Sequence, residues 1–186
     1  MKQQHKDSIE GNKATQLRQA FDHRFALPPS ADAPEVQDLL AIRVAGDPYA
    51  IGLLDITEIV TGRSVVAVPT ITPGLLGLAG IRGGIVPVFS LSSMLGYSPD
   101  PGSPRWMVLC GAEEPIALAF SDFEGYLRLP TSALHAEENF SATSEKTKYV
   151  SQAARTPGGV RAVISIALIL ATIRNRISQH RPTKEK

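Results

Sequence analysis

Short runs of β-branched and aromatic residues, separated by glycine or proline, constrain this 186-residue chain most strongly. Such runs are typical of strands, because branched side chains pack well on a pleated surface and Gly and Pro interrupt it. Many short strands of this kind favour barrels or a sandwich. We predict a mainly β fold, with strands at 38–45, 49–54, 65–68, 85–89, 105–110, 115–120, 125–129, 149–153 and 160–165.

The hydrophobic period changes near the C-terminus. Five apolar residues there recur at helical spacing, namely Ile166, Ile169, Leu170, Ile173 and Ile177. With Ser165 as N-cap they predict a helix over 166–178. Residues 174–186 hold five basic residues and one acidic residue, a net charge of +4. This tail either solubilises the terminus, which its few scattered charges favour, or contacts anionic lipid.

Residues 1–35 form an N-terminal arm that ends in a proline-containing linker at 27–34. Four apolar residues of the arm recur at helical spacing, namely Leu17, Ala20, Phe21 and Phe25. Residues 15–25 therefore form either an amphipathic helix that docks on the core or on a partner, or part of a frayed arm. The pattern leaves both alternatives open.

Composition and charge exclude several classes of protein. The net charge of +1 provides no general attraction for nucleic acid. The lone cysteine, Cys110, rules out an internal disulfide framework and a cysteine-based metal cluster, and it fits a reducing cytoplasm. The apolar stretch 71–89 is interrupted by Pro, Gly and Arg, and 163–173 is too short to span a bilayer. We expect no membrane insertion.

Motifs that carry catalysis are missing from the sequence. It has neither a Gly-x-Ser-x-Gly elbow nor a phosphate-binding Gly-Lys-Ser/Thr loop. The acidic pairs Glu113-Glu114 and Glu137-Glu138 lie in turn-like sequence and are better explained as solvated turns than as an acid/base pair. We therefore expect no enzymatic activity, no metal site and no cofactor.

The two halves of the chain repeat one pattern. Residues 83–91 (GGIVPVFSL) match 158–166 (GGVRAVISI), each with a Gly-Gly turn, a strand, a serine and an apolar helix start. Upstream, 53–59 parallels 120–126. The repeat predicts two small barrels, at about 36–104 and 105–173, with a groove between them where a partner can bind.

Three segments carry a family pattern: YAIGLLDITEI at 49–59, VP at 68–69 and LGLAGIRGGIVPV at 76–88. Together they resemble the chemotaxis coupling protein CheW, over about residues 38–173. The resemblance implies two five-stranded SH3-like barrels side by side and a cytoplasmic, non-catalytic adaptor. It also implies two partners, the regulatory domain of a CheA-type histidine kinase and the cytoplasmic tip of a methyl-accepting chemoreceptor, with recruitment to receptor clusters.

The resemblance also implies which residues bind partners. Ile56 and Glu58 fall on the family's Val-x-Glu step, and Arg82 falls on its Arg-Gly turn. Glu58 could orient the Arg82 guanidinium through a charge-assisted bond, and the alternative is a structural pair without a partner role. Leu78 and Val88 are candidate apolar contacts or their support, and either could be plain core.

The sequence also departs from the family pattern. Ser90, Ser121 and Ser165 stand where the family often has aspartate. Ser90 and Ser165 can still cap a helix, so we expect a divergent member with the same fold. Two other function classes stay open: a regulatory module that binds a small ligand or a membrane through the basic tail, and an enzyme.

Overall fold

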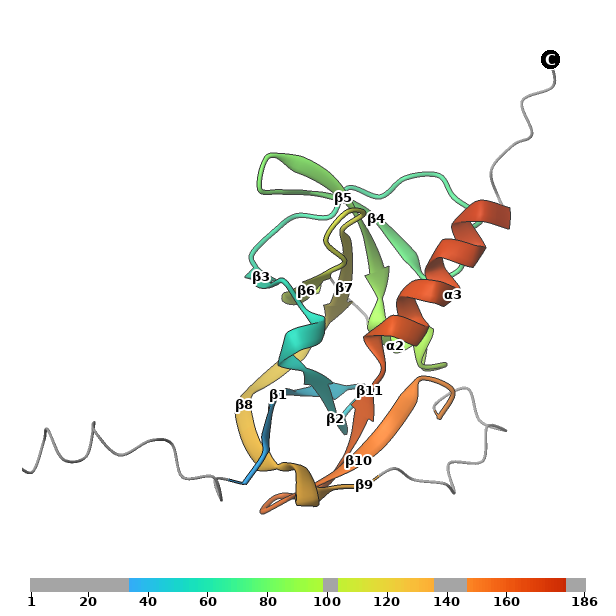
Figure 1. The fold of residues 1–186 in the computed structure, drawn as a ribbon. Coiled ribbons are helices and arrows are strands. Elements are labelled where there is room, and N and C mark those ends of the chain that lie inside the picture. Colours follow the sequence, from blue (N-terminus) through green and yellow to red (C-terminus); the bar gives the residue numbers. More distant parts are fainter. Residues whose placement is uncertain (1–33, 99–103, 136–146, 180–186) are drawn as a thin grey trace, which may run out of the picture. The chain divides into compact units, whose positions relative to one another are not determined.

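The computed structural model describes residues 34–98, 104–135 and 147–179, and over these ranges the chain is mainly β, which confirms the predicted class. The helix considered at 15–25 lies outside the described residues. The described strands form two antiparallel-rich sheets, drawn one above the other in Figure 1.

The first sheet has six strands, which occur in the order β8 (Asp122–Pro130), β1 (Val36–Val44), β2 (Asp47–Gly52), β11 (Gly159–Ile164), β10 (Val150–Thr156) and β9 (Leu134–His135). A β-bulge between Ala41 and Ile42 shifts the register of β1 against β8. β8 leads through the short helix η2 (Thr131–Ala133) into β9, so the chain joins the two edge strands of this sheet.

The second sheet has five strands, in the order β3 (Glu58–Thr61), β6 (Trp106–Cys110), β7 (Ile116–Phe120), β5 (Gly84–Ser90) and β4 (Leu75–Ile81). The chain that follows β3 closes this sheet at Val66, which exchanges two backbone hydrogen bonds of 2.8 and 2.9 Å with Leu78 on β4. The strand expected at 65–68 is therefore a single bridge. The pattern also missed β4, because Gly77 and Gly80 interrupt its apolar run.

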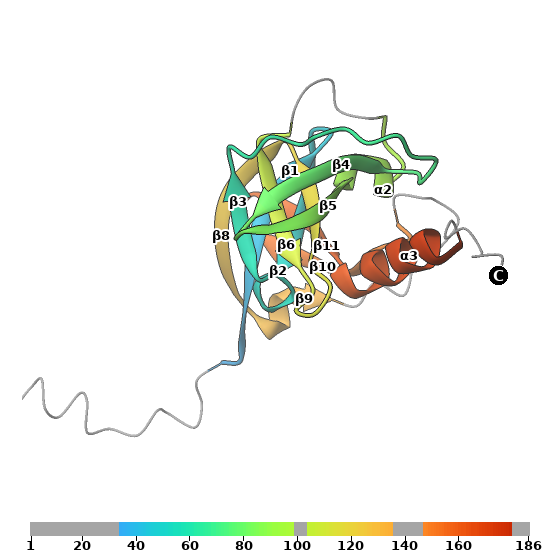
Figure 2. The same cartoon turned by 90° about the horizontal axis from the view of Figure 1, so that it is seen from above.

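Three further helices occur in the described ranges: η1 (Leu53–Asp55), α2 (Leu91–Met94) and α3 (Ile166–Gln179). α3 confirms the predicted C-terminal helix, and Figure 2 shows it to one side of the strands. The two expected serine caps are present. Ser90 Oγ accepts a hydrogen bond from the Ser93 amide at 3.1 Å, and Ser165 Oγ accepts one from the Leu168 amide at 3.4 Å.

Three apolar clusters form the core. The largest joins both sheets to α2 and α3, and two smaller ones each lie on the other face of one sheet. β7 shows why. Leu118 and Phe120 lie in the shared cluster, whereas Ala117 and Ala119 lie in the cluster of the second sheet. A strand that is buried on both faces needs a continuous apolar run, and β7 has one.

The two sequence repeats exchange their first hairpins. The hairpin β1–β2, from the first half, joins β8 to β11, and β6–β7, from the second half, joins β3 to β5. The predicted barrel boundary at about 104/105 is therefore wrong, since each sheet contains strands from both halves. The reason is that β5 pairs with β7 and β11 pairs with β2, both in parallel. A parallel partner cannot be the adjacent strand of a tight hairpin.

Candidate functional site

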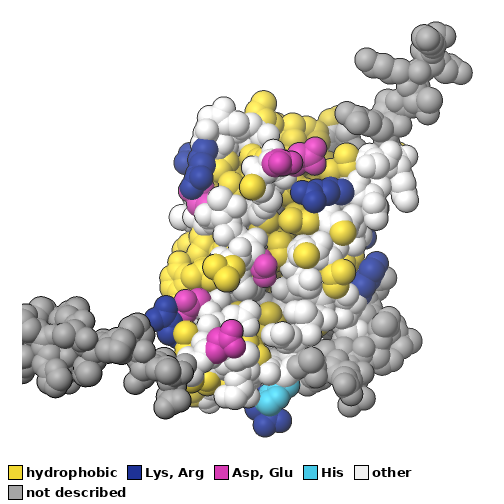
Figure 3. All heavy atoms as spheres, viewed as in Figure 1, with side chains coloured by type: hydrophobic (Ala, Val, Ile, Leu, Met, Phe, Trp, Pro, Cys, Tyr) yellow, Lys and Arg dark blue, Asp and Glu magenta, His cyan; other side chains and the backbone are white. Residues whose placement is uncertain are grey.

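An apolar surface surrounds η1, where the first sheet meets β3. We call it the η1 surface and define it by the residues Leu53, Leu54, Ile56, Glu58 and Tyr126. The Leu54 side chain is fully exposed, and Tyr126 of β8 is 64% exposed. A hollow of about 310 Å³ is lined by Ile56, Glu58 and Tyr126 among others. In Figure 3, which shows the face drawn in Figure 1, hydrophobic side chains gather between separate charged ones.

Glu58 and Arg82 meet at the edge of this surface. Glu58 begins β3, and Arg82 lies at the tip of the β4–β5 hairpin, with 2.6 Å between Arg82 Nε and Glu58 Oε2. Oε2 accepts no hydrogen bond from the described residues, so the contact is an ion pair without hydrogen-bond alignment. The Arg82 side chain is 62% exposed, which makes the pair weak in itself and open to a partner.

The hairpin turn fixes where Arg82 points. Arg82 and Gly83 are its two central residues and both have positive φ, 50° and 77°. This is the pattern of the two-residue turns that match the twist of β-hairpins, and it favours glycine or asparagine. An arginine in the left-handed region is a modest strain. The turn therefore holds the Arg82 side chain at the exposed end of the hairpin.

The other three residues predicted to bind partners, Ile56, Val88 and Leu78, lie in different parts of the structure. Ile56 is half-buried against the shared core beside Glu58. Val88 is fully buried in the cluster of the second sheet, so it cannot touch a partner and supports the sheet from inside. Leu78 is half-buried on β4, opposite Pro87 of β5, so it lies away from Val88 on the other face of the sheet.

The sequence did not predict a row of three aromatic rings in contact, which we call the aromatic string: Trp106, Phe123 and Tyr126. The Trp106 ring on β6 lies 5.1 Å from that of Phe123, which lies 5.7 Å from that of Tyr126, so the string crosses from the second sheet to the first. Phe123 and Tyr126 both lie on β8, whereas Trp106 lies on β6 in the other sheet, so the contact between Trp106 and Phe123 joins two strands that are not neighbours in the chain. No local pattern signals such a contact, and only the fold brings these rings to the η1 surface.

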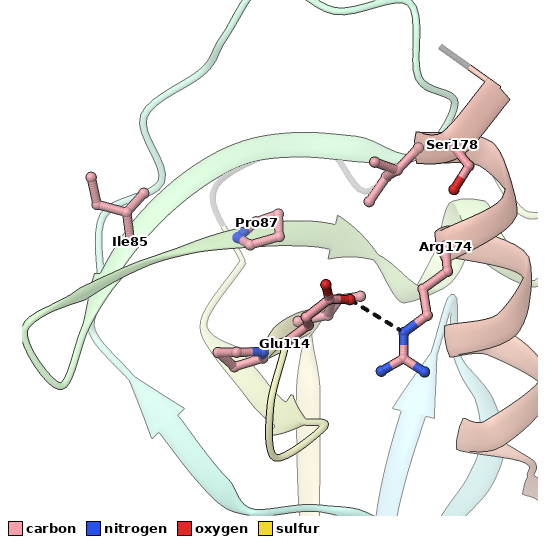
Figure 4. A pocket seen from close by; sticks show the side chains of 8 residues that line it. Ile85, Pro87, Glu114, Arg174 and Ser178 are labelled. Atoms are coloured by element: carbon pink, nitrogen blue, oxygen red, sulfur yellow. Dashed lines mark ion pairs between the residues drawn. The ribbon is translucent and has the colours of Figure 1, made fainter. Parts of the chain in front are cut away.

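A second hollow, the β5–α3 groove, lies between β5, the β6–β7 turn and α3. It measures about 570 Å³ and shares no lining residue with the hollows at the η1 surface. Figure 4 shows Ile85 and Pro87 on one wall, Arg174 on α3, and Glu114 between them. Ile85 is 77% exposed and Ile177 of α3 is 42% exposed. The groove is therefore apolar with one charged pair.

The described residues offer no group of three or more His, Cys, Asp or Glu side chains that could hold a metal ion. Burial raises the pKa of the Cys110 thiol to about 12, and the charge of Asp55 adds to this effect. A thiol with such a pKa is protonated at neutral pH and is a poor nucleophile. In the described ranges, no helix is long and apolar enough to cross a membrane.

Comparison with known proteins agrees with this architecture. The family model of the CheW-like domain matches residues 38–174, most of the chain. The chain belongs to the CheW-like domain family. Its structure is similar to the crystal structure of the scaffolding protein TtCheW from Thermoanaerobacter tengcongensis, with a TM-score of 0.61 and 18% identity, over 71% of this chain and 89% of that chain. A search of curated proteins found no match.

Membership in the CheW-like domain family confirms the fold expected from the sequence resemblance, two SH3-like barrels. The similar crystal structure is that of a scaffolding protein. The serines that replace the family's aspartates at 90 and 165 keep their capping role in this CheW-like domain.

Proposed function

We propose that this CheW-like domain is a non-catalytic adaptor that couples methyl-accepting chemoreceptors to a CheA-type histidine kinase. One observation carries the proposal: the η1 surface, with Leu54 and Tyr126 exposed, and the β5–α3 groove, with Ile85 exposed, have no lining residue in common. A protein that joins two partners needs two such surfaces. Its place of action is then the cytoplasm, at clusters of receptors.

The η1 surface suits the regulatory domain of the kinase. Its centre is apolar, with Leu54 and Tyr126 exposed, and its edge carries the Glu58–Arg82 pair. An apolar centre with a charged rim is the usual anatomy of a protein–protein interface. Ile56 and Glu58, at the family's Val-x-Glu step, line one hollow together, and this supports their contact with a folded partner domain.

The β5–α3 groove suits the helices of a receptor tip. β5 is paired on both sides, with β7 and β4, so a partner cannot add to it as a strand. What remains is a helix laid in the groove, with apolar side chains against Ile85 and Ile177. Leu78 lies beside Pro87 at this groove and would extend its apolar wall.

The adaptor role is tested by binding, with three samples of the full chain. The first is mixed with the regulatory domain of the kinase, the second with a receptor cytoplasmic hairpin fragment, and the third with both, each followed by size-exclusion chromatography with light scattering. We expect two binary complexes and one ternary complex. Competition between the two partners, or no binding to either, would contradict the adaptor role.

Arg82→Ala tests the η1 surface. We expect the variant to keep the unfolding midpoint of the wild type, because the ion pair is exposed, and to bind the kinase regulatory domain about tenfold more weakly. The matched control is Arg155→Ala, at an exposed arginine on β10. Equal affinity of Arg82→Ala and wild type, measured by calorimetry, would reject a kinase-binding role for Arg82.

A further inference from the structure

Arg174 and Glu114 face each other across the β5–α3 groove. Arg174 Nε lies 3.8 Å from Glu114 Oε2, at the far end of ion-pair range, and the two side chains are 50% and 80% exposed. A long and exposed pair contributes little free energy, because water screens it and both side chains lose freedom. Glu114 therefore holds Arg174 only loosely.

The surroundings of Arg174 favour an added negative charge. Arg174 and Arg176 lie toward the end of α3, and residues 174–179 contain no acidic residue. Arg176 is already engaged, since its Nη1 donates to the Pro73 carbonyl at 3.1 Å. Arg174 lines the groove, and within the described ranges its ion pair is the loose contact with Glu114.

Ile85, on the apolar wall of the groove, is exposed to solvent. Gly80 of β4 pairs with Ile85 across the hairpin, and the space above Gly80 is open. Ile85 therefore has no cross-strand side chain to cover it. A partner that binds in the groove therefore contacts the exposed Ile85 side chain on one side and the Arg174 guanidinium on the other.

We propose that the groove selects an acidic amphipathic helix, and that a carboxylate of this helix replaces Glu114 as the partner of Arg174. The inference rests on the proposed function, since it names what the receptor helix must present. Apolar residues of the helix cover Ile85 and Ile177, and an Asp or Glu three or four positions away reaches Arg174. Glu114 then acts as an internal competitor for Arg174.

Two substitutions with opposite expected effects test this exchange. The probe is the receptor cytoplasmic hairpin fragment, and the readout is its dissociation constant with the full chain. Arg174→Gln should weaken binding about tenfold and flatten its dependence on NaCl concentration, because the charge-assisted bond is lost. Glu114→Gln should tighten binding by about two- to fivefold, because the competitor is gone.

Matched controls lie close by. Glu113→Gln changes an exposed glutamate of the same turn, and Arg155→Gln an exposed arginine of β10; both should leave the dissociation constant unchanged. Ile85→Ser should weaken binding if the groove is the receptor site.

The outcomes distinguish the exchange at Arg174 from the binding of a receptor helix in the groove. Weaker binding by both Arg174→Gln and Glu114→Gln would mean that the pair merely fastens α3 to the turn, and would overturn the exchange. Unchanged binding by both, with Ile85→Ser weakened, would overturn the exchange and leave the receptor groove in place. Failure of the wild type to bind the fragment would overturn the receptor half of the proposed function, and the exchange with it.

Discussion

Gly77 holds the closure of the second sheet. Its φ is +149°, and a Cβ at this position would lie 2.2 Å from the Val66 carbonyl oxygen, at the backbone bridge between Val66 and Leu78. We expect Gly77→Ala to lower the free energy of unfolding by about 2–4 kcal/mol, since the clash falls on backbone and the φ is rarely adopted by other residues. Chemical denaturation measures the change.

Gly80→Ala is the matched control on the same strand. The space around Gly80 is open, so we expect a change within about 0.5 kcal/mol. If Gly77→Ala were equally neutral, the bridge at Val66 would not hold the barrel closed.

At the scale of elements, three strands of the first sheet are tied by one carboxylate. Glu124 of β8 contacts Arg43 of β1 at 2.6 Å and Arg161 of β11 at 2.5 Å. Burial opposes ionisation of Glu124, but the hydrogen bonds from Arg43 and Arg161 outweigh it and lower its pKa below the ordinary value of 4.5. The ionised form is therefore favoured in the folded state, and it stabilises the arrangement of these strands.

The lowered pKa of Glu124 sets the direction of a pH effect. Its contribution to stability is full above pH 4.5 and is lost as the pH falls through the lower folded-state pKa. We expect Glu124→Gln to lower the free energy of unfolding by about 1–2 kcal/mol at pH 7, with the difference from wild type shrinking toward pH 3. Urea unfolding across this pH range tests it, and a difference that grows on acidification contradicts the sign.

At the scale of the whole molecule, the exchange of hairpins makes the two repeats depend on each other. Residues 36–104 alone would hold β1–β2 without β8 and β11, and β3–β5 without β6–β7. We expect the fragments 36–104 and 105–179 to lack dispersed amide NMR signals separately and to regain them when mixed, because each barrel needs strands from both. A folded isolated fragment would contradict the exchange.

Sequence alone determined the elements whose signals are local. The 3.6-residue period predicted α3, the Ser90 and Ser165 caps followed from their place before apolar runs, and motif spacing identified the family. The tight turn that presents Arg82 also followed from its neighbouring glycines. Each of these depends on residues within a few positions of one another, where backbone preference and side-chain chemistry act directly.

Only the tertiary structure decided what depends on residues far apart in the chain. Parallel pairing of β5 with β7 and of β11 with β2 exchanged the hairpins, and no turn sequence records such a choice. The same long-range packing buried Val88 and placed Arg174 opposite Glu114 across a groove. Burial and pairing of this kind depend on which surfaces meet when the core forms, and this is a property of the whole chain.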